Sequence, residues 1–337
     1  MTEMTVLNGV AIEELLTIPM AVEAVEQAYL EKSKGDAALW PMVFHEFDPG
    51  HADLDIKSGD LGGLGFYGLK VVSWFGANPG KGLPALYGTS LLFDLATGAP
   101  RALLNAGPIT DFRTGAAGAI GAKHLARPDA ETLLMAGTGA LAPYLIAATL
   151  YLLPQIKTVY VANPHHPECS AAACEAITPQ VEKLLSGCGG CHAAIAAAPD
   201  LEKAVRHSDV ILTATPAREP FIKAEWVQPG THISCVGADM SGKQEVDSAL
   251  FASAKVFGDD TAQCLSVGEC EVPYKAGVFS GHICEIGGVI SGAEAGRTDA
   301  SDITIFDSTG IALQDIATAA ALLQAAQETG KGQTVTL

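Results

Sequence analysis

The chain has 337 residues, of which 48% are hydrophobic and 17% charged, a composition typical of a globular protein and not of a disordered one. This length is enough for two domains of ordinary size, each with its own core. The net charge of −18 argues against nucleic acid or an anionic membrane as a partner, because both are bound by basic surfaces. An anionic ligand must therefore be held by a few local cations.

The sequence predicts neither a secretion signal nor a membrane span. The first ten residues contain Glu3 and lack an apolar core, and no apolar run reaches the roughly 18 residues of a membrane-spanning helix. We therefore expect a cytoplasmic protein whose eight cysteines are reduced thiols. Residues 188–192 match the C-x-x-C-H form of a covalent haem site and half of a zinc site. Such haem attachment requires export and zinc requires more ligands, so we interpret them as a glycine loop and predict no metal site.

The first hundred residues are predicted to form one helix and a mainly antiparallel sheet. Apolar residues recur at helical spacing over residues 11–33, where Asn8 is suited to cap the helix and Gly35 to end it. Runs typical of strands follow one another with turn residues between them. These runs are residues 4–8, 43–47, 54–58, 68–74, 87–94 and 101–105.

Beyond residue 110 the pattern changes to alternating strands and helices. A helix rich in alanine and glycine is predicted over 116–125, and an alanine-rich last helix over 311–328 is expected to return to the N-terminal domain. The alternation predicts right-handed crossovers and a parallel, doubly wound sheet, which is an α/β fold. Strands are expected near 132–136, 158–163, 192–196, 209–213, 231–236, 254–258 and 303–307, and helices near 140–153, 168–186, 200–207, 222–226 and 246–252.

A glycine turn between the first strand and the first helix of this region is the central motif. It reads G-x-G-x-x-A from Gly137 to Ala142, an accepted form of the dinucleotide fingerprint. Backbone N–H groups and the helix dipole at such a turn suit a pyrophosphate, although a turn of this kind can also be purely structural. The predicted cofactor contacts of the turn are Gly137, Thr138, Gly139 and Ala140.

The next strand ends at Asn163, 26 residues after Gly137, where the adenosine ribose normally lies. An acidic residue there would favour NAD, and a following arginine would favour NADP. Asn163 can bond either ribose hydroxyl, and Pro164 occupies the usual place of the arginine, so we favour NAD without excluding NADP. His165 and His166 could contact a phosphate, but histidines of an ordinary surface loop are the commoner case.

Two later strands end in small residues that let a ligand approach the backbone. Together with the glycine turn, these strand ends form a crevice at the carboxyl edge of the sheet, which favours the dinucleotide interpretation over a purely structural turn. The predicted cofactor contacts at the two ends are Thr213, Ala214, Thr215, Val236 and Gly237.

Further short motifs extend along almost the whole chain. They include Gly68-Leu69-Lys70, Gly82-Leu83-Pro84, Asp94 with Thr97-Gly98, Thr110 with Arg113-Thr114, Pro229-Gly230-Thr231-His232, Val236-Gly237-Ala238-Asp239, Gly268-Glu269, Gly296-Arg297 and Phe306-Asp307-Ser308-Thr309-Gly310. In this order they resemble the ornithine cyclodeaminase/mu-crystallin family, which includes alanine dehydrogenases, imine reductases and lysine cyclodeaminases.

The resemblance implies a homodimer of two-domain subunits. Residues 1–112 with 311–337 would form an α+β domain for substrate binding and dimerisation, and residues 113–310 a Rossmann dinucleotide-binding domain. It also implies chemistry at the Cα–N bond of an L-α-amino acid, with hydride passing to or from a nicotinamide. Ser308 and Gly310 match family positions near that ring.

Three residues fit this chemistry on their own properties. Lys70 and Arg113 are cations that could hold the substrate carboxylate, and Lys70 lies in an apolar strand, where a lysine is costly unless paired. Either could instead form an internal ion pair. Asp239 follows a strand, and the resemblance makes it the acid/base or the partner of the substrate nitrogen, with an ordinary turn residue as the alternative. We predict Asp239 and Lys70 as catalytic, and Lys70 and Arg113 as substrate-binding.

One departure from the family leaves the substrate open. Members that act on ornithine often have a further arginine after the first helix, whereas residues 41–45 contain none. His45 or Lys57 could replace it.

The leading hypothesis is an NAD(P)-dependent amino-acid dehydrogenase or cyclic-imine reductase. The second is a cyclodeaminase, which returns the hydride to the ring product and releases ammonia. The third is a non-catalytic binding protein like mu-crystallin, and the presence of Lys70, Arg113 and Asp239 argues against it.

Overall fold

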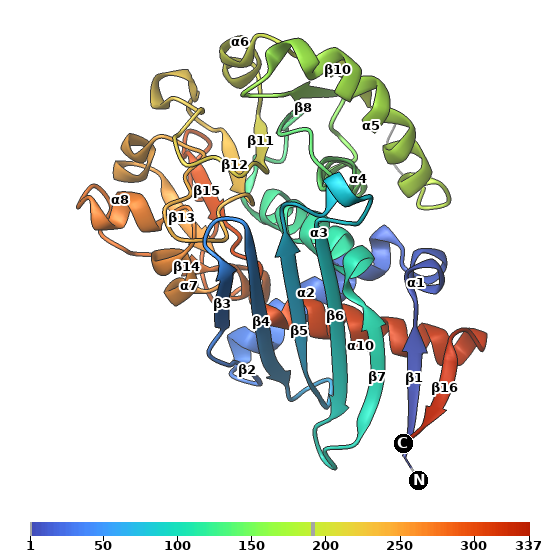
Figure 1. The fold of residues 1–337 in the computed structure, drawn as a ribbon. Helices are drawn as coiled ribbons and strands as arrows, with labels where there is room; N and C mark the ends of the chain where they lie inside the picture. Colours follow the sequence, from blue (N-terminus) through green and yellow to red (C-terminus); the bar gives the residue numbers. More distant parts are fainter. Residues whose placement is uncertain (1, 190–192) are drawn as a thin grey trace. The chain divides into compact units, whose positions relative to one another are not determined.

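The computed structural model describes residues 2–189 and 193–337, and the chain divides into two compact units (Figure 1). Unit 1 comprises the chain as far as Arg113 together with Ile311–Leu337, and unit 2 is Thr114–Gly310. The C-x-x-C-H motif of residues 188–192 lies partly outside the described residues. Among the helices of the described residues, none has the length and apolar character that crossing a membrane requires.

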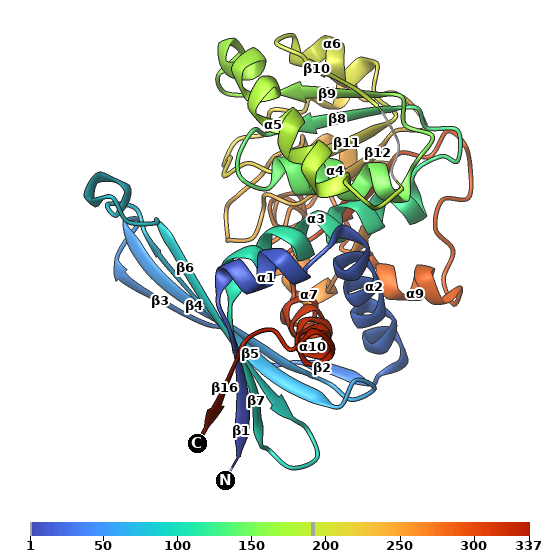
Figure 2. The ribbon, with the colours of Figure 1, turned by 90° about the vertical axis from the view of Figure 1, so that its right-hand side faces the viewer.

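Unit 1 is built on a mixed sheet in the order β16-β1-β7-β6-β5-β4-β2, with β3 paired to β4. All neighbours are antiparallel except β1 and β7. Helix α10 packs on α2 and over β4 and β5, as Figure 2 shows. The strands are β1 (Glu3–Leu7), β2 (Ala37–Leu39), β3 (Val43–Asp48), β4 (Ala52–Leu61), β5 (Phe66–Phe75), β6 (Leu86–Asp94), β7 (Pro100–Asn105) and β16 (Gln333–Thr336), and the helices are α1 (Gly9–Leu15), α2 (Ile18–Lys34) and α10 (Ala312–Thr329).

The single N-terminal helix predicted over residues 11–33 is wrong, because the structure has two helices there. Thr17 Oγ1 accepts the backbone N–H three residues further on, at 3.3 Å, and so caps α2 as a new helix. Pro19 in the first turn of α2 has no N–H to continue the hydrogen bonding of α1. Asn8 caps α1 and Gly35, at φ +77°, ends α2, as predicted.

Unit 2 contains eight parallel strands in the order β10-β9-β8-β11-β12-β15-β13-β14. The part β10-β9-β8-β11-β12 has the 3-2-1-4-5 order of a Rossmann sheet, and the chain changes direction between β8 and β11, where ligands of such folds bind. The strands are β8 (Thr132–Ala136), β9 (Thr158–Ala162), β10 (Ala194–Ala197), β11 (Val210–Thr213), β12 (His232–Cys235), β13 (Lys255–Gly258), β14 (Cys284–Glu285) and β15 (Thr304–Asp307).

Short helices connect these strands, and α4 and α5 lie against β8, β9 and β10. Every residue of β11, β12 and β15 is buried, as in the central strands of a parallel sheet. The buried residues include polar ones, namely Thr213, His232, Ser234, Thr304 and Asp307. The helices are α4 (Ala142–Leu152), α5 (Ser170–Leu185), α6 (Leu201–Arg206), α7 (Thr261–Ser266), α8 (Glu271–Lys275) and α9 (Ile286–Ser291). The α/β fold with a parallel Rossmann sheet and a mixed α+β sheet is confirmed.

Several element predictions need correction. Helix α3 (Ala106–Leu125) begins ten residues before the predicted 116, with Asn105 Oδ1 accepting an N–H of its first turn at 2.9 Å. The helices predicted over 222–226 and 246–252 are short 3₁₀ turns, η3 (Ala224–Trp226) and η4 (Ser248–Ala252). The sequence did not predict β2, β14, β16, α7, α8 or α9, which are too short or too polar to show a hydrophobic period.

Candidate functional site

Unit 1 contains a buried group of three charged side chains, which we call the Lys70 cluster: Lys70 on β5, Arg113 on α3 and Asp315 on α10. Lys70 Nζ donates to Asp315 Oδ1 at 2.8 Å and to Thr110 Oγ1 at 3.3 Å. Arg113 Nε lies 3.3 Å from the same Asp315 oxygen. None of the three side chains is more than 8% exposed. The two cations predicted to bind substrate therefore share one internal carboxylate.

A second contact fixes the guanidinium. Arg113 Nη1 donates to Gln314 Oε1 at 2.9 Å, and Gln314 Nε2 donates to Tyr29 Oη at 2.7 Å. Gln314 and Asp315 are consecutive on α10, so one turn of that helix holds both sides of Arg113. The orientation of the guanidinium is thus set before any ligand arrives.

The Lys70 cluster has more positive than negative charge. Burial, and then the neighbouring Arg113, lower the pKa of Lys70 to about 8, against the opposing influence of Asp315. Burial alone would raise the pKa of Asp315, but Arg113 and Lys70 hold it below its usual value. Among the described residues, Asp315 Oδ2 and Arg113 Nε have no hydrogen-bond partner. At neutral pH two cations thus face one carboxylate, which suits a small anionic ligand.

The two residues suggested in place of the missing arginine differ in position. Lys57 on β4 is directly opposite Lys70 in the β4–β5 register. Its positive charge lowers the pKa of Lys70 further, in addition to burial and Arg113. His45 is exposed on β3, paired with Leu54, and its ring contacts Phe47 edge-on at 5.0 Å. Of the two, Lys57 is the one beside the Lys70 cluster.

In unit 2 the glycine turn follows β8 as predicted. Gly137 has φ +132°, and a Cβ there would lie 2.5 Å from the Ala214 carbonyl oxygen, so the turn needs glycine to pass the end of β11. A Cβ on Gly139 would meet no protein atom within 4 Å. Thr138 Oγ1 accepts a hydrogen bond from Asn163 Nδ2 at 2.9 Å. The turn and the end of β9 are therefore brought together, with an open side at Gly139.

The ends of β11 and β12 are joined by a carboxylate that the sequence analysis missed. Glu245 accepts hydrogen bonds from the Thr213 hydroxyl (2.7 Å), from the N–H and hydroxyl of Thr215 (2.7 and 2.8 Å) and from the Gly237 N–H (2.9 Å). Burial raises the pKa of Glu245, and the hydrogen bonds from the two threonines oppose that rise. Both hydroxyls are thus occupied inside the protein. These hydrogen bonds to Glu245 fix the backbone at the ends of β11 and β12, next to Ala214 and Val236.

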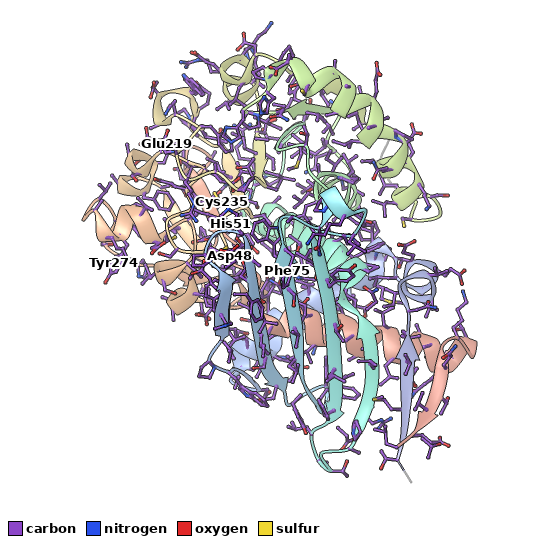
Figure 3. All side chains as sticks on the ribbon, viewed as in Figure 1. Asp48, His51, Phe75, Glu219, Cys235 and Tyr274 are labelled. Atoms are coloured by element: carbon purple, nitrogen blue, oxygen red, sulfur yellow. The ribbon has the colours of Figure 1, made fainter. Side chains whose placement is uncertain are left out.

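The loop after β15 is held in the same way. Asp259 accepts hydrogen bonds from the Gly310 N–H at 2.9 Å and the Thr309 hydroxyl at 2.8 Å, and the Ser308 N–H donates to the carbonyl of Cys235, which is labelled in Figure 3. Burial raises the pKa of Asp259. Ser308 and Gly310 are therefore fixed beside the end of β12.

Asp239 differs from these carboxylates because its side chain is 51% exposed. Its Oδ1 lies 2.5 Å from Lys243 Nζ, and the lysine itself is mostly buried. Asp239 is therefore an accessible carboxylate on a loop next to the strand ends. Neither Lys243 nor Asp315 was singled out from the sequence, although an acid inside the apolar stretch of α10 was a usable signal for Asp315.

Comparison with known proteins identifies the family. The model of the ornithine cyclodeaminase/mu-crystallin family matches residues 2–330, and the chain belongs to this family. It is 36% identical to the alanine dehydrogenase of Archaeoglobus fulgidus over 321 residues, which cover 94% of this chain and 93% of that protein.

Two solved structures are similar over their whole length. An archaeal alanine dehydrogenase dimer with bound NAD has a TM-score of 0.86 and 35% identity, covering 99% of both chains. The iminosuccinate reductase of Paracoccus denitrificans, in complex with NAD+, has a TM-score of 0.89 and 31% identity, covering 99% of this chain and 100% of that one.

Proposed function

We propose that the chain is an NAD-dependent oxidoreductase that acts at the Cα–N bond of an L-α-amino acid or its imine, as an amino-acid dehydrogenase or imine reductase. The observation that carries this proposal is the Lys70 cluster, where two buried cations share one carboxylate in a chain of net charge −18. An α-carboxylate would balance the surplus charge, and Arg113 offers it parallel N–H donors. Holding the carboxylate fixes the direction of the Cα–H bond.

The glycine turn fits a dinucleotide. Its open side at Gly139 would let a pyrophosphate approach the backbone, and Asn163 stands where the adenosine ribose binds in such sheets. Pro164 follows Asn163, at the position where an arginine would hold a 2′-phosphate. We therefore propose NAD as the cofactor, with NADP as an outcome to be tested.

Asp239 is the proposed acid/base. In the oxidative direction Cα loses a hydride and the nitrogen loses a proton, which leaves the imine. A bound nicotinamide would supply the acceptor for this hydride and, in the reductive direction, its donor. An accessible carboxylate such as Asp239 can accept the proton from the amine and give it back to the imine.

A substrate screen tests the proposal. In the oxidative direction, L-alanine, L-aspartate, L-proline, L-ornithine and L-lysine are each supplied with NAD+ or NADP+. In the reductive direction, NADH or NADPH is supplied with a cyclic imine, or with a keto acid and ammonia. Nicotinamide absorbance and free ammonia are read together. We expect an absorbance change with NAD for one class of these compounds. Ammonia release without a net absorbance change would replace the proposal with a cyclodeaminase, and cofactor binding without turnover would replace it with a binding protein.

The Asp239→Asn variant tests the acid/base role separately. We expect kcat to fall at least about 100-fold, the usual contribution of a positioned acid/base. The Kd for NAD should stay within about twofold, because the amide preserves the size of the side chain. Near-normal turnover would show that Asp239 does not move the proton.

We also infer that the chain forms a homodimer through unit 1. Edge strand β3 is exposed along its whole length although it carries apolar side chains, and Phe75, labelled in Figure 3, stacks on Phe47 at 5.8 Å. Exposed apolar surface of this extent is typical of an interface. We expect Phe47→Asp to give monomers in sedimentation, and Leu95→Asp, an exposed apolar site elsewhere in unit 1, to leave the dimer intact. The exposed apolar side chains of β3 and of the neighbouring ends of β5 and β6 are Val43, Phe44, Phe47, Phe75, Leu86 and Tyr87.

A further inference from the structure

The loop that carries Asp239, residues 237–245, is held by two carboxylates from one short segment. Glu269 accepts the backbone N–H groups of Glu245 and Val246 at 2.8 and 2.7 Å. Glu271 accepts the Ser241 hydroxyl at 2.5 Å with one oxygen and the Gly242 N–H at 2.7 Å with the other. Both glutamates are almost completely buried. Alternate residues of one segment thus hold the middle and the end of the Asp239 loop.

The same loop is also closed on itself. The Glu245 carboxylate accepts the Gly237 N–H, which ties the last residue of the loop to the first. Lys243 N–H donates to the Met240 carbonyl at 3.2 Å, and Gly242 adopts φ +79° in this turn. The backbone from 237 to 245 is therefore fixed at several points. The Asp239 side chain, at the accessible part of the loop, is half-exposed.

Holding the end of this loop with Glu269 is costly for a loop that only connects two elements. Burial raises the pKa of Glu269, and the charge of Glu245 raises it further, so unit 2 accommodates mutually unfavourable carboxylates in order to hold this segment. Neutral side chains can cap a surface loop without that cost. Close control of loop position is needed when a reacting group has to be placed accurately, since an error of about 1 Å can lower a rate about 100-fold.

We propose that Glu269 and Glu271 are positioning residues for Asp239: they hold the loop so that its carboxylate stays where the proton is exchanged. The inference rests on the proposed function, since it needs Asp239 to exchange a proton with the substrate nitrogen. Glu271 is the better residue to test, because it contacts the middle of the loop and does not touch the strand ends at Glu245.

The experiment compares Glu271→Ala with Glu271→Gln. We expect the alanine variant to lower kcat about 10- to 100-fold, to leave the Kd for NAD within about twofold, and to speed hydrogen exchange of residues 238–244. Glutamine should restore most of kcat, because its amide oxygen can accept the Gly242 N–H and its amide nitrogen can donate to Ser241 Oγ. Lys275→Met is the matched control, because it removes the exposed ion partner of Glu271 and leaves both contacts to the loop.

Two results would overturn the proposal. One is a wild-type kcat in Glu271→Ala while hydrogen exchange of the loop is faster. The other is an equal loss in the alanine and glutamine variants with a lower Tm and weaker NAD binding, which would mean structural support alone.

Combination with Asp239→Asn separates this inference from the proposed function. If Glu271 acts through Asp239, adding Glu271→Ala to Asp239→Asn should not lower the residual single-turnover rate further. A further loss would contradict the positioning role. If Asp239→Asn is inactive and Glu271→Ala is normal, only the positioning role fails. If Asp239→Asn is itself normal, the acid/base role fails.

Discussion

Replacing Lys70 by methionine removes one buried positive charge and keeps a side chain of similar length within β5. Asp315 still has Arg113, with Nε–Oδ1 at 3.3 Å, so no buried carboxylate is left without a cation. The excess positive charge of the Lys70 cluster disappears. A hydrogen bond to a charged group contributes about 1.5–3 kcal/mol, which corresponds to roughly a 10- to 150-fold lower kcat/KM for the amino acid.

The same change should cost little stability. Burial and Arg113 lower the pKa of Lys70 to about 8 in the folded state, below its ordinary value of 10.5, so the fold disfavours the ammonium form. The Tm of Lys70→Met should therefore stay close to that of the wild type, and NAD should bind normally, because the predicted cofactor contacts belong to unit 2.

Steady-state kinetics at pH 7, NAD titration and thermal unfolding check this prediction. Lys331→Met is the matched control, since it removes a lysine of unit 1 that forms a surface ion pair with Glu14 at 2.6 Å. It should leave all three measurements unchanged. A kcat/KM within twofold of the wild type for Lys70→Met would refute the view that the Lys70 cluster binds the substrate carboxylate.

Three further predictions concern Lys70, the glycine turn and Asp307. Lys70 loses its binding charge when it loses its proton, so kcat/KM should fall as the pH rises through about 8. The Asp315 carboxylate raises the pKa of Lys70, so Asp315→Asn should move this fall to lower pH. Both effects are measured in pH–rate profiles. Gly137→Ala should lower the Tm, because its Cβ would lie 2.5 Å from a backbone carbonyl oxygen, whereas Gly139→Ala should keep the Tm and weaken NAD binding in a titration, because only the ligand would meet that Cβ. Burial raises the pKa of Asp307 from 3.8 to about 7, so the folded state favours the protonated form. The contribution of this protonated carboxyl to the stability of the fold is lost as the pH rises from about 4 to 7. Asp307→Asn, which mimics that form, should raise the free energy of unfolding at pH 8 by up to about 4 kcal/mol over the wild type and have little effect at pH 4, as measured by denaturant titration.

The sequence predicts most strands of unit 2 because short runs with apolar and β-branched residues recur there between helical segments. It predicts the N-terminal helices poorly. The apolar spacing continues across residues 11–33, so it predicts one helix. The chain nevertheless forms two helices, because Thr17 caps a new helix and Pro19 lies in its first turn, and hydrophobic periodicity does not reveal either effect. Strand β16 pairs with β1 although all four of its residues are exposed, so no alternation marks it.

The candidate site shows a similar division between what is visible in the sequence and what is not. Lys70 could be singled out because a charge in an apolar strand is visible in the sequence, and Arg113 because it stands in a family motif; their binding of a ligand stays a prediction. Their partner Asp315 could not be assigned, since the pairing joins residues 245 positions apart and depends on how α10 lies over β5. Glu269 is visible in the sequence only as part of the Gly268-Glu269 motif, with no role attached, and Glu271 is not marked at all. Most of their partners are backbone N–H groups, which nearly every sequence supplies.

The distribution of buried charge is the strongest argument for the Lys70 cluster as an anion site. Among the described residues, the completely buried acids are spread over both units, and those of unit 2 are satisfied largely by backbone N–H groups. Among all the residues that the structure describes, the buried lysine and arginine side chains are Lys70 and Arg113, both in unit 1. Both contact Asp315. One cation is enough to neutralise a carboxylate, and a second buried beside it raises the cost of burial for both. A chain of net charge −18 that keeps such a pair has cationic capacity for one more carboxylate, which is what an α-amino acid or its imine brings.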